Sequence, residues 1–244
     1  MAFAEAGILE QFSVVICGII YPAYALIHFP GTRKRINNSE SNRMSEYRTM
    51  LFIYTGLSIV VAVNVATGTP ESMKIPEPRV AALTFFLLIT AFIIVQFRQK
   101  LQQDDIRIIR SKMENIWLFL PKSRREYLYY ISLSIAAAVS EELVFRYYLF
   151  HVLTDYGLSI WIAILACNIL FALTHSRAGF ENMISSFFLG LMFSLIYYFS
   201  GWIILPMLLH GAIEIAAGRT GIAVYNNLMN KQANHRTGIQ APGK

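Results

Sequence analysis

The sequence of 244 residues contains little charge and little cysteine. Charged residues make up 15% of the chain and hydrophobic residues 55%, whereas a typical soluble domain carries about 25% charged residues. This balance excludes a soluble globular enzyme and a disordered tail protein. The two cysteines, Cys17 and Cys167, both stand inside apolar runs, where cysteine acts as a small buried apolar residue. A disulfide-stapled secreted domain is therefore excluded as well.

Positive charge is absent from the start of the chain, where no Lys or Arg precedes Arg33. The apolar run at 8–28 therefore lacks the positive beginning of a signal peptide. We predict that it is a retained membrane helix; the alternative is cleavage after Ala23-Tyr24-Ala25.

Long apolar runs dominate the rest of the sequence. Because a membrane helix needs about 20 apolar residues, the chain is predicted to be an all-α, polytopic transmembrane bundle of about seven to eight spans. The candidate spans are 8–28, 49–67, 79–97, 127–153, 158–177, 182–199 and 202–217.

The net charge of +6 comes from Lys and Arg in alternate loops. The segments 29–48, 98–126 and 218–244 are rich in both residues, whereas the 68–78 loop contains only Lys74. Positively charged loops stay in the cytoplasm, so the N-terminus is predicted to lie outside an inner cell membrane. This topology explains the charge with a lipid bilayer as partner and without nucleic acid.

The chain divides into three predicted parts. Residues 1–126 hold the first membrane helices and a cytoplasmic segment, 127–217 form a helical core, and 218–244 form a loose polar tail. Within 98–126, apolar residues interleaved with Arg predict an amphipathic helix on the inner leaflet; a charged loop is the alternative. In the sixth span, Ser186, Gly190 and Ser194 repeat every four residues and predict close helix packing.

Ionisable side chains are rare inside the predicted spans and are concentrated in the last four. Such residues are costly in a membrane and usually mark a function. The first three spans contain little beyond Glu10 and His28, so any chemistry is predicted in the four C-terminal helices. The residues in question are Glu141, Glu142, Arg146, His151, His175, His210 and Glu214.

Two adjacent glutamates stand in the middle of the fourth span. Glu142 and Arg146 are four residues apart, so they are predicted to pair on one helix face. Glu141 points about 100° away from this pair. It has no partner in its own helix and is a candidate proton acceptor. The alternative is that all three residues form a purely structural polar cluster between helices.

Two histidines follow on later helices. His175 ends the fifth span, and His210 lies four residues before Glu214 in the seventh. Together with Glu141 they allow two kinds of hydrolysis of a carbonyl compound. In one, His175, His210, Glu141 and Glu214 hold a divalent metal such as zinc, which acidifies a water. In the other, Glu141 and His175 activate water directly, and His210 stabilises the oxyanion.

Three sequence boxes resemble those of the CPBP family of CAAX-processing and bacteriocin-processing intramembrane proteases. They are Glu-Glu-x-x-x-Arg at 141–146, Phe-x-x-x-His at 171–175 and His-x-x-x-acid at 210–214. The resemblance covers about residues 127–217 and implies a glutamic-type intramembrane endopeptidase.

The resemblance also assigns roles to the residues of these boxes. It implies that Glu141 is catalytic beside Glu142 and Arg146, that His175 helps to activate water and that His210 stabilises the oxyanion. The family often has Asn where this chain has Glu214. A carboxylate there suits metal ligation or the orientation of His210.

A membrane-anchored protein or peptide is the implied substrate, either a prenylated CAAX C-terminus or a processed peptide tail. No cofactor is certain, although zinc or another divalent metal is compatible with the residues. Two alternatives stay open: a transporter or channel with an acid and histidine proton relay, and a non-catalytic immunity or binding protein of the same fold. The sequence does not predict an oligomeric state.

Overall fold

The computed structural model describes residues 7–36, 39–67, 81–98, 105–114 and 116–237. Within these ranges the regular elements are helices and no strand occurs, which confirms the predicted all-α class. The predicted loop at 68–78 and residues 99–104 and 238–244 lie outside the described residues.

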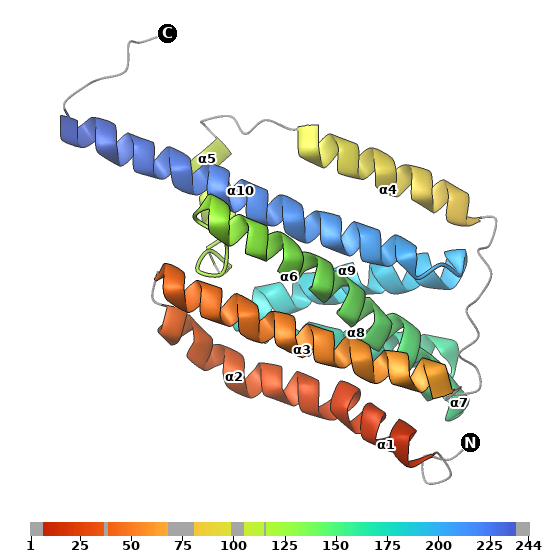
Figure 1. Ribbon diagram of the computed structural model, residues 1–244. Coiled ribbons are helices and arrows are strands. Elements are labelled where there is room, and N and C mark those ends of the chain that lie inside the picture. The colour runs from red at the N-terminus through yellow and green to blue at the C-terminus, as the bar shows by residue number, and fades with distance from the viewer. Residues whose placement is uncertain (1–6, 37–38, 68–80, 99–104, 115, 238–244) are drawn as a thin grey trace.

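The described helices form seven rods that run in alternating directions (Figure 1). In the first and fourth rods a π-helical turn joins two α-helices, at Ile16–Ile20 and Leu143–Tyr148. The α-helices are α1 (Ile8–Val15), α2 (Tyr21–Ile36), α3 (Glu40–Thr67), α4 (Ala81–Arg98), α6 (Arg124–Glu142), α7 (Leu149–Asp155), α8 (Ile160–Thr174), α9 (Phe180–Ser200) and α10 (Ile204–Thr237), and the short α5 (Asp105–Lys112) lies between the third and fourth rods.

Four of the described helical segments are long and apolar enough to cross a membrane, which confirms a helical membrane bundle. Each of the seven predicted spans coincides with one of the rods, and those at 79–97 and 158–177 correspond to shorter apolar helices. Thus α8 has 15 residues and reaches about 22 Å at 1.5 Å per residue, less than the apolar core of about 30 Å. The four long segments are Ile8–His28, Glu40–Thr67, Arg124–Asp155 and Phe180–Ser200, and the shorter ones are Ala82–Gln96 and Ile160–Thr174.

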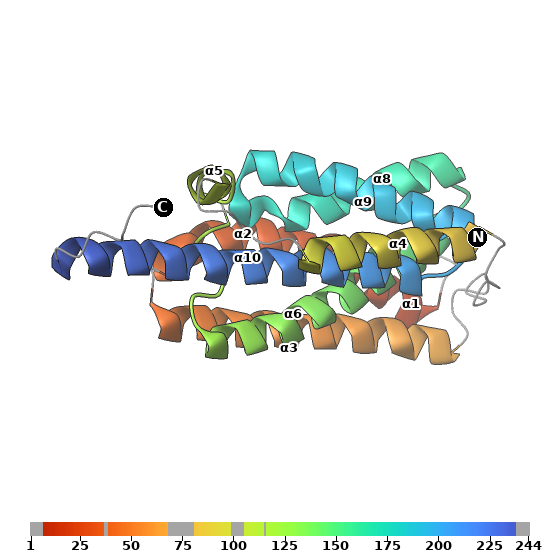
Figure 2. The same ribbon diagram turned by 90° about the horizontal axis from the view of Figure 1, so that it is seen from above.

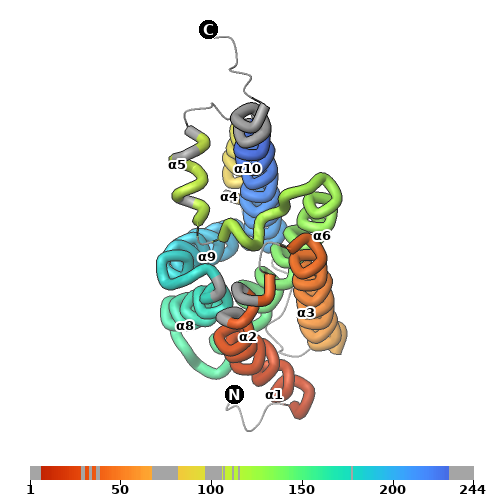
Figure 3. Tube along the Cα trace, turned by 90° about the vertical axis from the view of Figure 1, so that its left-hand side faces the viewer, coloured from red at the N-terminus to blue at the C-terminus, as the bar shows by residue number. Residues whose placement is uncertain are grey.

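A ring of helices closes around the bundle axis (Figure 3). Contacts run from α2 to α3, α6, α10, α9, α8 and back to α2, while α4 lies outside against α9 and α10. Large apolar side chains such as Ile27 and Phe52 are exposed on the outer surface, which suits contact with lipid tails. The interior of the ring is where buried polar side chains can meet.

The C-terminal part of α10 corrects the prediction of a loose tail at 218–244, because the helix continues to Thr237. It extends beyond the ends of the other helices (Figures 1 and 2). Val224 is fully buried in a cluster with Ile106, Trp117 and Leu120. This packing, rather than a long apolar run, holds the polar part of α10 in helical form.

The segment between α4 and α6 also differs from the prediction. The described amphipathic helix is α5, which is much shorter than 98–126, and Ile106, Trp117 and Leu120 face α10. Ile108 remains exposed. The apolar residues of this segment are thus used mainly for packing against protein, and residues 116–123 cover one end of the ring (Figure 3).

The start of α6 is fixed by a capping box, in which Glu126 and Ser123 bond each other's backbone N–H groups. Glu126 is fully buried and also accepts from Arg43 of α3, whose Nε lies 2.8 Å from Oε1. Since the same carboxylate serves the cap and the ion pair, it fixes α3 beside α6. This contact sets the register of the two helices that meet again at Glu141.

The predicted small-residue face of α9 is confirmed as a close contact. Ser186, Gly190 and Ser194 are all buried, and a Cβ atom on Gly190 would come within 2.6 Å of Arg146 and Asn168. The absence of a side chain at Gly190 therefore makes room for the guanidinium of Arg146.

Candidate active site

The last residues of α6 and the π-helical turn after it carry the central polar cluster. Glu142 Oε1 accepts a hydrogen bond from Arg146 Nη1 at 3.1 Å, which confirms the pairing predicted from their spacing. Both side chains are buried. Such π-helical turns are rare and often occur at functional sites.

Arg146 is held by residues from two further helices. Its Nη2 donates to Asn168 Oδ1 at 3.3 Å, and Asn168 in turn donates to Ser194. The guanidinium also lies over the ring of Phe171, 4.1 Å from the centroid. Arg146 thus links the glutamates to α8 and α9 and leaves Glu142 with a fixed cation.

His210 of α10 meets both glutamates. Its Nδ1 lies 2.9 Å from Glu142 Oε1, and its Nε2 lies 3.7 Å from Glu141 Oε2 and 3.7 Å from Glu214 Oε1. The ring is buried and stacks on Phe193. Because a carboxylate accepts, Nδ1 carries a proton that it donates to Glu142, and this fixes Nε2 toward Glu141 and Glu214.

Glu141 has two partners that the sequence did not identify. Tyr21 and Tyr54 both donate to its Oε1, at 2.9 and 3.1 Å. Among the described residues no hydrogen-bond donor reaches the buried Oε2. Glu141 therefore lacks a partner in its own helix, as predicted, but it has two partners on other helices.

The sequence does not single out the two tyrosines, because an uncharged hydroxyl does not stand out in an apolar span as an acid or a histidine does. Tyr21 opens α2 and Tyr54 lies in the middle of α3, and both are buried. A tyrosine inside a membrane span needs a partner for its hydroxyl. That requirement was the signal available in the sequence.

His175 lies at the C-terminal end of α8, as predicted from the sequence. Its Nδ1 is 3.0 Å from the carbonyl oxygen of Phe171, which can only accept, so Nδ1 carries the proton. Asn182 of α9 donates to the carbonyl of His175 at 3.3 Å. These contacts fix the ring and leave Nε2 as the nitrogen that can accept a proton.

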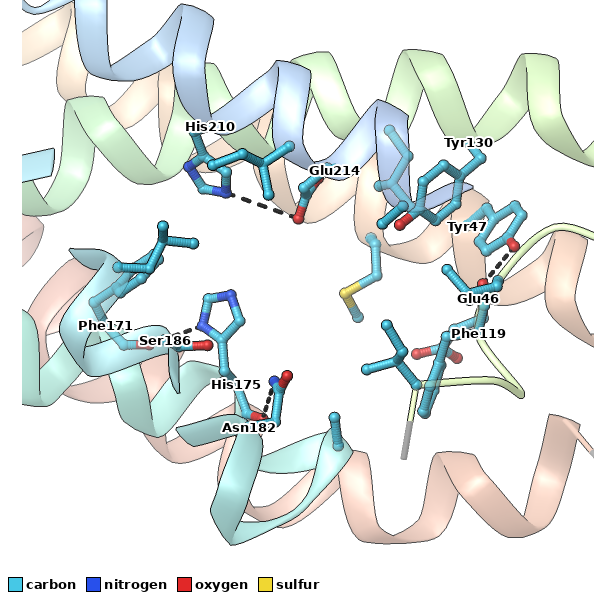
Figure 4. A pocket seen from close by; sticks show the side chains of 18 residues that line it. Glu46, Tyr47, Phe119, Tyr130, Phe171, His175, Asn182, Ser186, His210 and Glu214 are labelled. Carbon is cyan, nitrogen blue, oxygen red and sulfur yellow. Dashed lines mark hydrogen bonds and ion pairs between the residues drawn. The ribbon is translucent and has the colours of Figure 1, made fainter. Parts of the chain in front are cut away.

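A cavity of about 190 Å³ lies between the two histidines. His175 and His210 occupy facing walls, with Glu214 beside His210 and Glu46 on the far side (Figure 4). The cavity is lined by Glu46, Tyr47, Met50, Ile116, Phe119, Leu120, Tyr130, Leu133, Phe171, His175, Ala178, Asn182, Ser186, Leu189, His210, Ile213, Glu214 and Ala217.

Glu141 and Glu142 do not belong to this lining and lie behind His210. The structure therefore brings Glu141, Glu142, Arg146, His210 and Glu214 together and places His175 across the cavity from them. His151 of the fourth rod is partly buried, lies 3.1 Å from the hydroxyl of Tyr197 and does not line the cavity.

The predicted metal ligands do not form a set around one point. Among the described residues, no three His, Cys, Asp or Glu side chains are arranged to hold a metal ion. His210 is within 3.7 Å of Glu141 and Glu214, but His175 stands on the opposite wall. The donor set does not fit a metal in this arrangement, and we derive no step through one.

Lys122 belongs to the segment that covers the cavity, but its side chain does not line the cavity. Partial burial and the neighbouring Arg43 lower its pKa to about 8.

Residues 123–216 match the model of a known family, described as Rce1-like type II CAAX prenyl endopeptidase. This family consists of proteases, and the match includes all six predicted site residues, from Glu141 to Glu214. The resemblance to CAAX-processing proteases is thereby confirmed for this segment. Tyr21 and Tyr54 lie outside it. No curated protein and no solved structure matches the chain.

Proposed function

We propose that this protein is an intramembrane endopeptidase that hydrolyses a peptide bond in a membrane-associated protein, with a water activated by Glu141 and His175. The observation that carries the proposal is the contact of His210 with both Glu141 and Glu142 at the wall of a cavity that His175 also lines. Two histidines that line one cavity, with two buried acids directly behind His210, are suited to general acid–base hydrolysis of an amide.

The first step is proton removal from water. Tyr21 and Tyr54 hold Oε1 of Glu141, so Oε2 is the oxygen left to accept a proton. His175 Nε2 orients the same water from the opposite wall. The water oxygen then forms a bond to the carbonyl carbon, and the carbonyl oxygen becomes an oxyanion. Substrate binding would bring Glu141 and the water together, as catalytic hydrogen bonds often tighten only in the complex.

The second step is collapse of the tetrahedral intermediate. His210 Nε2 stabilises the oxyanion when the ring carries protons on both nitrogens, with Glu142 accepting from Nδ1. The carbon–nitrogen bond breaks, and the proton held by Glu141 passes to the departing amine. Arg146 keeps Glu142 in place throughout.

Glu214 replaces the neutral donor that the family often carries at this position. An ionised carboxylate cannot donate a hydrogen bond to an oxyanion. At 3.7 Å from His210 Nε2, it is placed to supply negative charge beside a doubly protonated ring. We therefore assign it to the orientation of His210.

The proposed substrate is a prenylated CAAX C-terminus or another lipid-anchored tail that reaches the site from the cytoplasm. Support comes from the family match at 123–216 and from Arg43, Arg48 and Lys122, which lie in the elements at the end of the bundle where residues 116–120 cover the cavity. Positive segments stay in the cytoplasm.

Cleavage of a panel of peptides by the purified protein in lipid nanodiscs tests the proposal. The panel holds farnesylated CAAX peptides, the same peptides without the lipid and tail-anchored peptides, and mass spectrometry identifies the products. We expect cleavage of lipidated members, with the same rate after treatment with a chelator. Loss of activity on chelation, restored by zinc, would support the metal alternative instead. Absence of cleavage across the panel, with intact folded protein, would contradict the proposed function.

A further inference from the structure

The cavity has an acidic lining although it lies at the positively charged end of the bundle. Its described lining contains two carboxylates, Glu46 and Glu214, and neither Lys nor Arg. The net charge of the chain is +6, and Arg43, Arg48 and Lys122 all lie in the same part of the molecule. The lining therefore contains no Lys or Arg although both residues are common in this part of the chain.

Glu46 is the acid in this lining that the proposed reaction does not use. It lies on α3 and is only 9% exposed, and no hydrogen bond from the described residues reaches its buried Oε1. Leaving a buried carboxylate oxygen without a hydrogen-bond donor is costly. The Oε1 of Glu46 is therefore placed to receive a hydrogen bond from a donor outside the chain.

The nearest candidate within the chain is His28, whose Nε2 lies 3.9 Å from Glu46 Oε1. That nitrogen is also 2.8 Å from Arg35 Nη2. Since a guanidinium can only donate, Nε2 of His28 accepts from Arg35 and carries no proton for Glu46. Arg35 thus competes with Glu46 for this nitrogen, and the 3.9 Å contact leaves Oε1 of Glu46 without a hydrogen bond from His28.

The position of Glu46 and the size of the cavity indicate that its partner belongs to a bound peptide. Glu46 lies on the side of the cavity away from His175 and His210 (Figure 4). The cavity volume of about 190 Å³ is below the usual 300–1,000 Å³ of a small-molecule site, so it holds only a short part of a peptide. The peptide bond that follows the residue bound at Glu46 would then lie between His175 and His210.

We propose that Glu46 forms a subsite for a cationic side chain, Lys or Arg, of the substrate, near the bond that is cleaved. The inference rests on the proposed endopeptidase function and adds a preference in the substrate. Tyr47, the next residue, donates to the carbonyl of Phe119 at 2.6 Å and so holds the covering segment beside the subsite. Glu46, which would confer this preference, lies on α3, outside the segment 123–216 that matches the family model.

The test separates binding from cleavage. The probes are fluorescent farnesylated decapeptides with a single Lys moved through successive positions of an alanine background, each paired with a peptide that has norleucine at that position. Binding is measured to the Glu141→Gln protein in nanodiscs, which does not consume the probe. We expect Lys at one position to bind about tenfold or more tighter than norleucine, as a charge-assisted hydrogen bond would provide.

Glu46→Gln in the same background should remove this difference, and Glu46→Asp should keep part of it. Glu40→Gln is the matched control, since Glu40 is an exposed acid at the start of the same helix, and it should leave the difference intact. Equal binding of Lys and norleucine peptides, or a preference that survives Glu46→Gln, would overturn the subsite.

Cleavage of the same peptides by the protein with Glu141 intact makes the two proposals distinguishable. Cleavage without any Lys preference in binding removes the subsite and leaves the endopeptidase. A Lys preference that depends on Glu46, without cleavage, retains the subsite and removes the endopeptidase. Absence of both binding and cleavage overturns both proposals.

Discussion

At the scale of single residues, the site depends on how each carboxylate is held. Glu142 is paired with Arg146 and His210 through one oxygen, whereas Glu141 is held by two neutral phenols. Neutral donors fix a carboxylate without offering a competing charge. We therefore propose that Glu141 carries the chemistry and that Glu142 holds His210 in place.

Replacing the tyrosines tests this distinction. Tyr21→Phe and Tyr54→Phe each leave one phenol on Glu141, so we expect kcat to fall by about tenfold or less in each variant. The double variant should lose more than the product of the two single losses, because nothing then directs Oε1. Steady-state kinetics with the best peptide of the panel provide the measurement, with KM unchanged.

The matched control for these variants is Tyr24→Phe, on the same helix, where the ring stacks on His28. It should keep kcat. Losses that appear only in KM, or that follow a drop in thermal stability of equal size in all three variants, would contradict the positioning role.

Residue-scale prediction from the sequence succeeded where the interaction is local. The pair formed by Glu142 and Arg146 follows from a spacing of four residues, and it is present. The contacts of Glu141 join residues 120 and 87 positions apart. No periodicity within one helix encodes such contacts, so only the fold reveals them.

At the scale of elements, the close contact between α9 and its neighbours holds the cation of the site. Gly190 faces Arg146, Asn168 and Phe171, with less room than a methyl group requires. The four-residue repeat of small residues predicted this face, because it depends on helical geometry alone. The extension of α10 was not predicted, because its stability comes from side chains far away in the sequence, such as Trp117 and Leu120.

The packing at Gly190 leads to a stability prediction. Gly190→Ala should destabilise the protein by about 1–3 kcal/mol, the usual cost of overfilling a packed site, and should reduce activity by displacing Arg146. Thermal unfolding in nanodiscs measures the first effect. Gly56→Ala is the control: nothing lies within 4 Å of its Cβ position on α3, so it should be neutral or stabilise by up to about 1 kcal/mol. Equal melting temperatures for both variants would refute the packing role.

At the scale of the whole molecule, the family match at 123–216 does not contain the entire site. Helices α2 and α3 complete the ring and supply the donors to Glu141. The fold class and the C-terminal position of the histidines were predictable from composition and from rare charges. The contribution of the N-terminal helices was not, because polar partners without charge do not stand out against an apolar background.

The orientation in the membrane can be tested with single cysteines. Asn230 is exposed near the far end of α10 and Ser159 is exposed between α7 and α8. In intact cells a membrane-impermeant maleimide should label Ser159→Cys, and it should label Asn230→Cys only after permeabilisation. The parent chain is the control, since Cys17 and Cys167 are buried and should remain unlabelled. The opposite labelling pattern would reverse the proposed topology.

The most direct test of the central claim is the cleavage rate of the Glu141→Gln variant beside the parent protein and Glu40→Gln. Glutamine keeps the size of the side chain but cannot accept the proton of water, so we expect the rate on the best peptide to fall by at least about a hundredfold. The folded fraction and the melting temperature should stay close to those of the parent, and Glu40→Gln should remain fully active. A Glu141→Gln protein that cleaves at the parental rate would contradict the assignment of Glu141 as the residue that activates water.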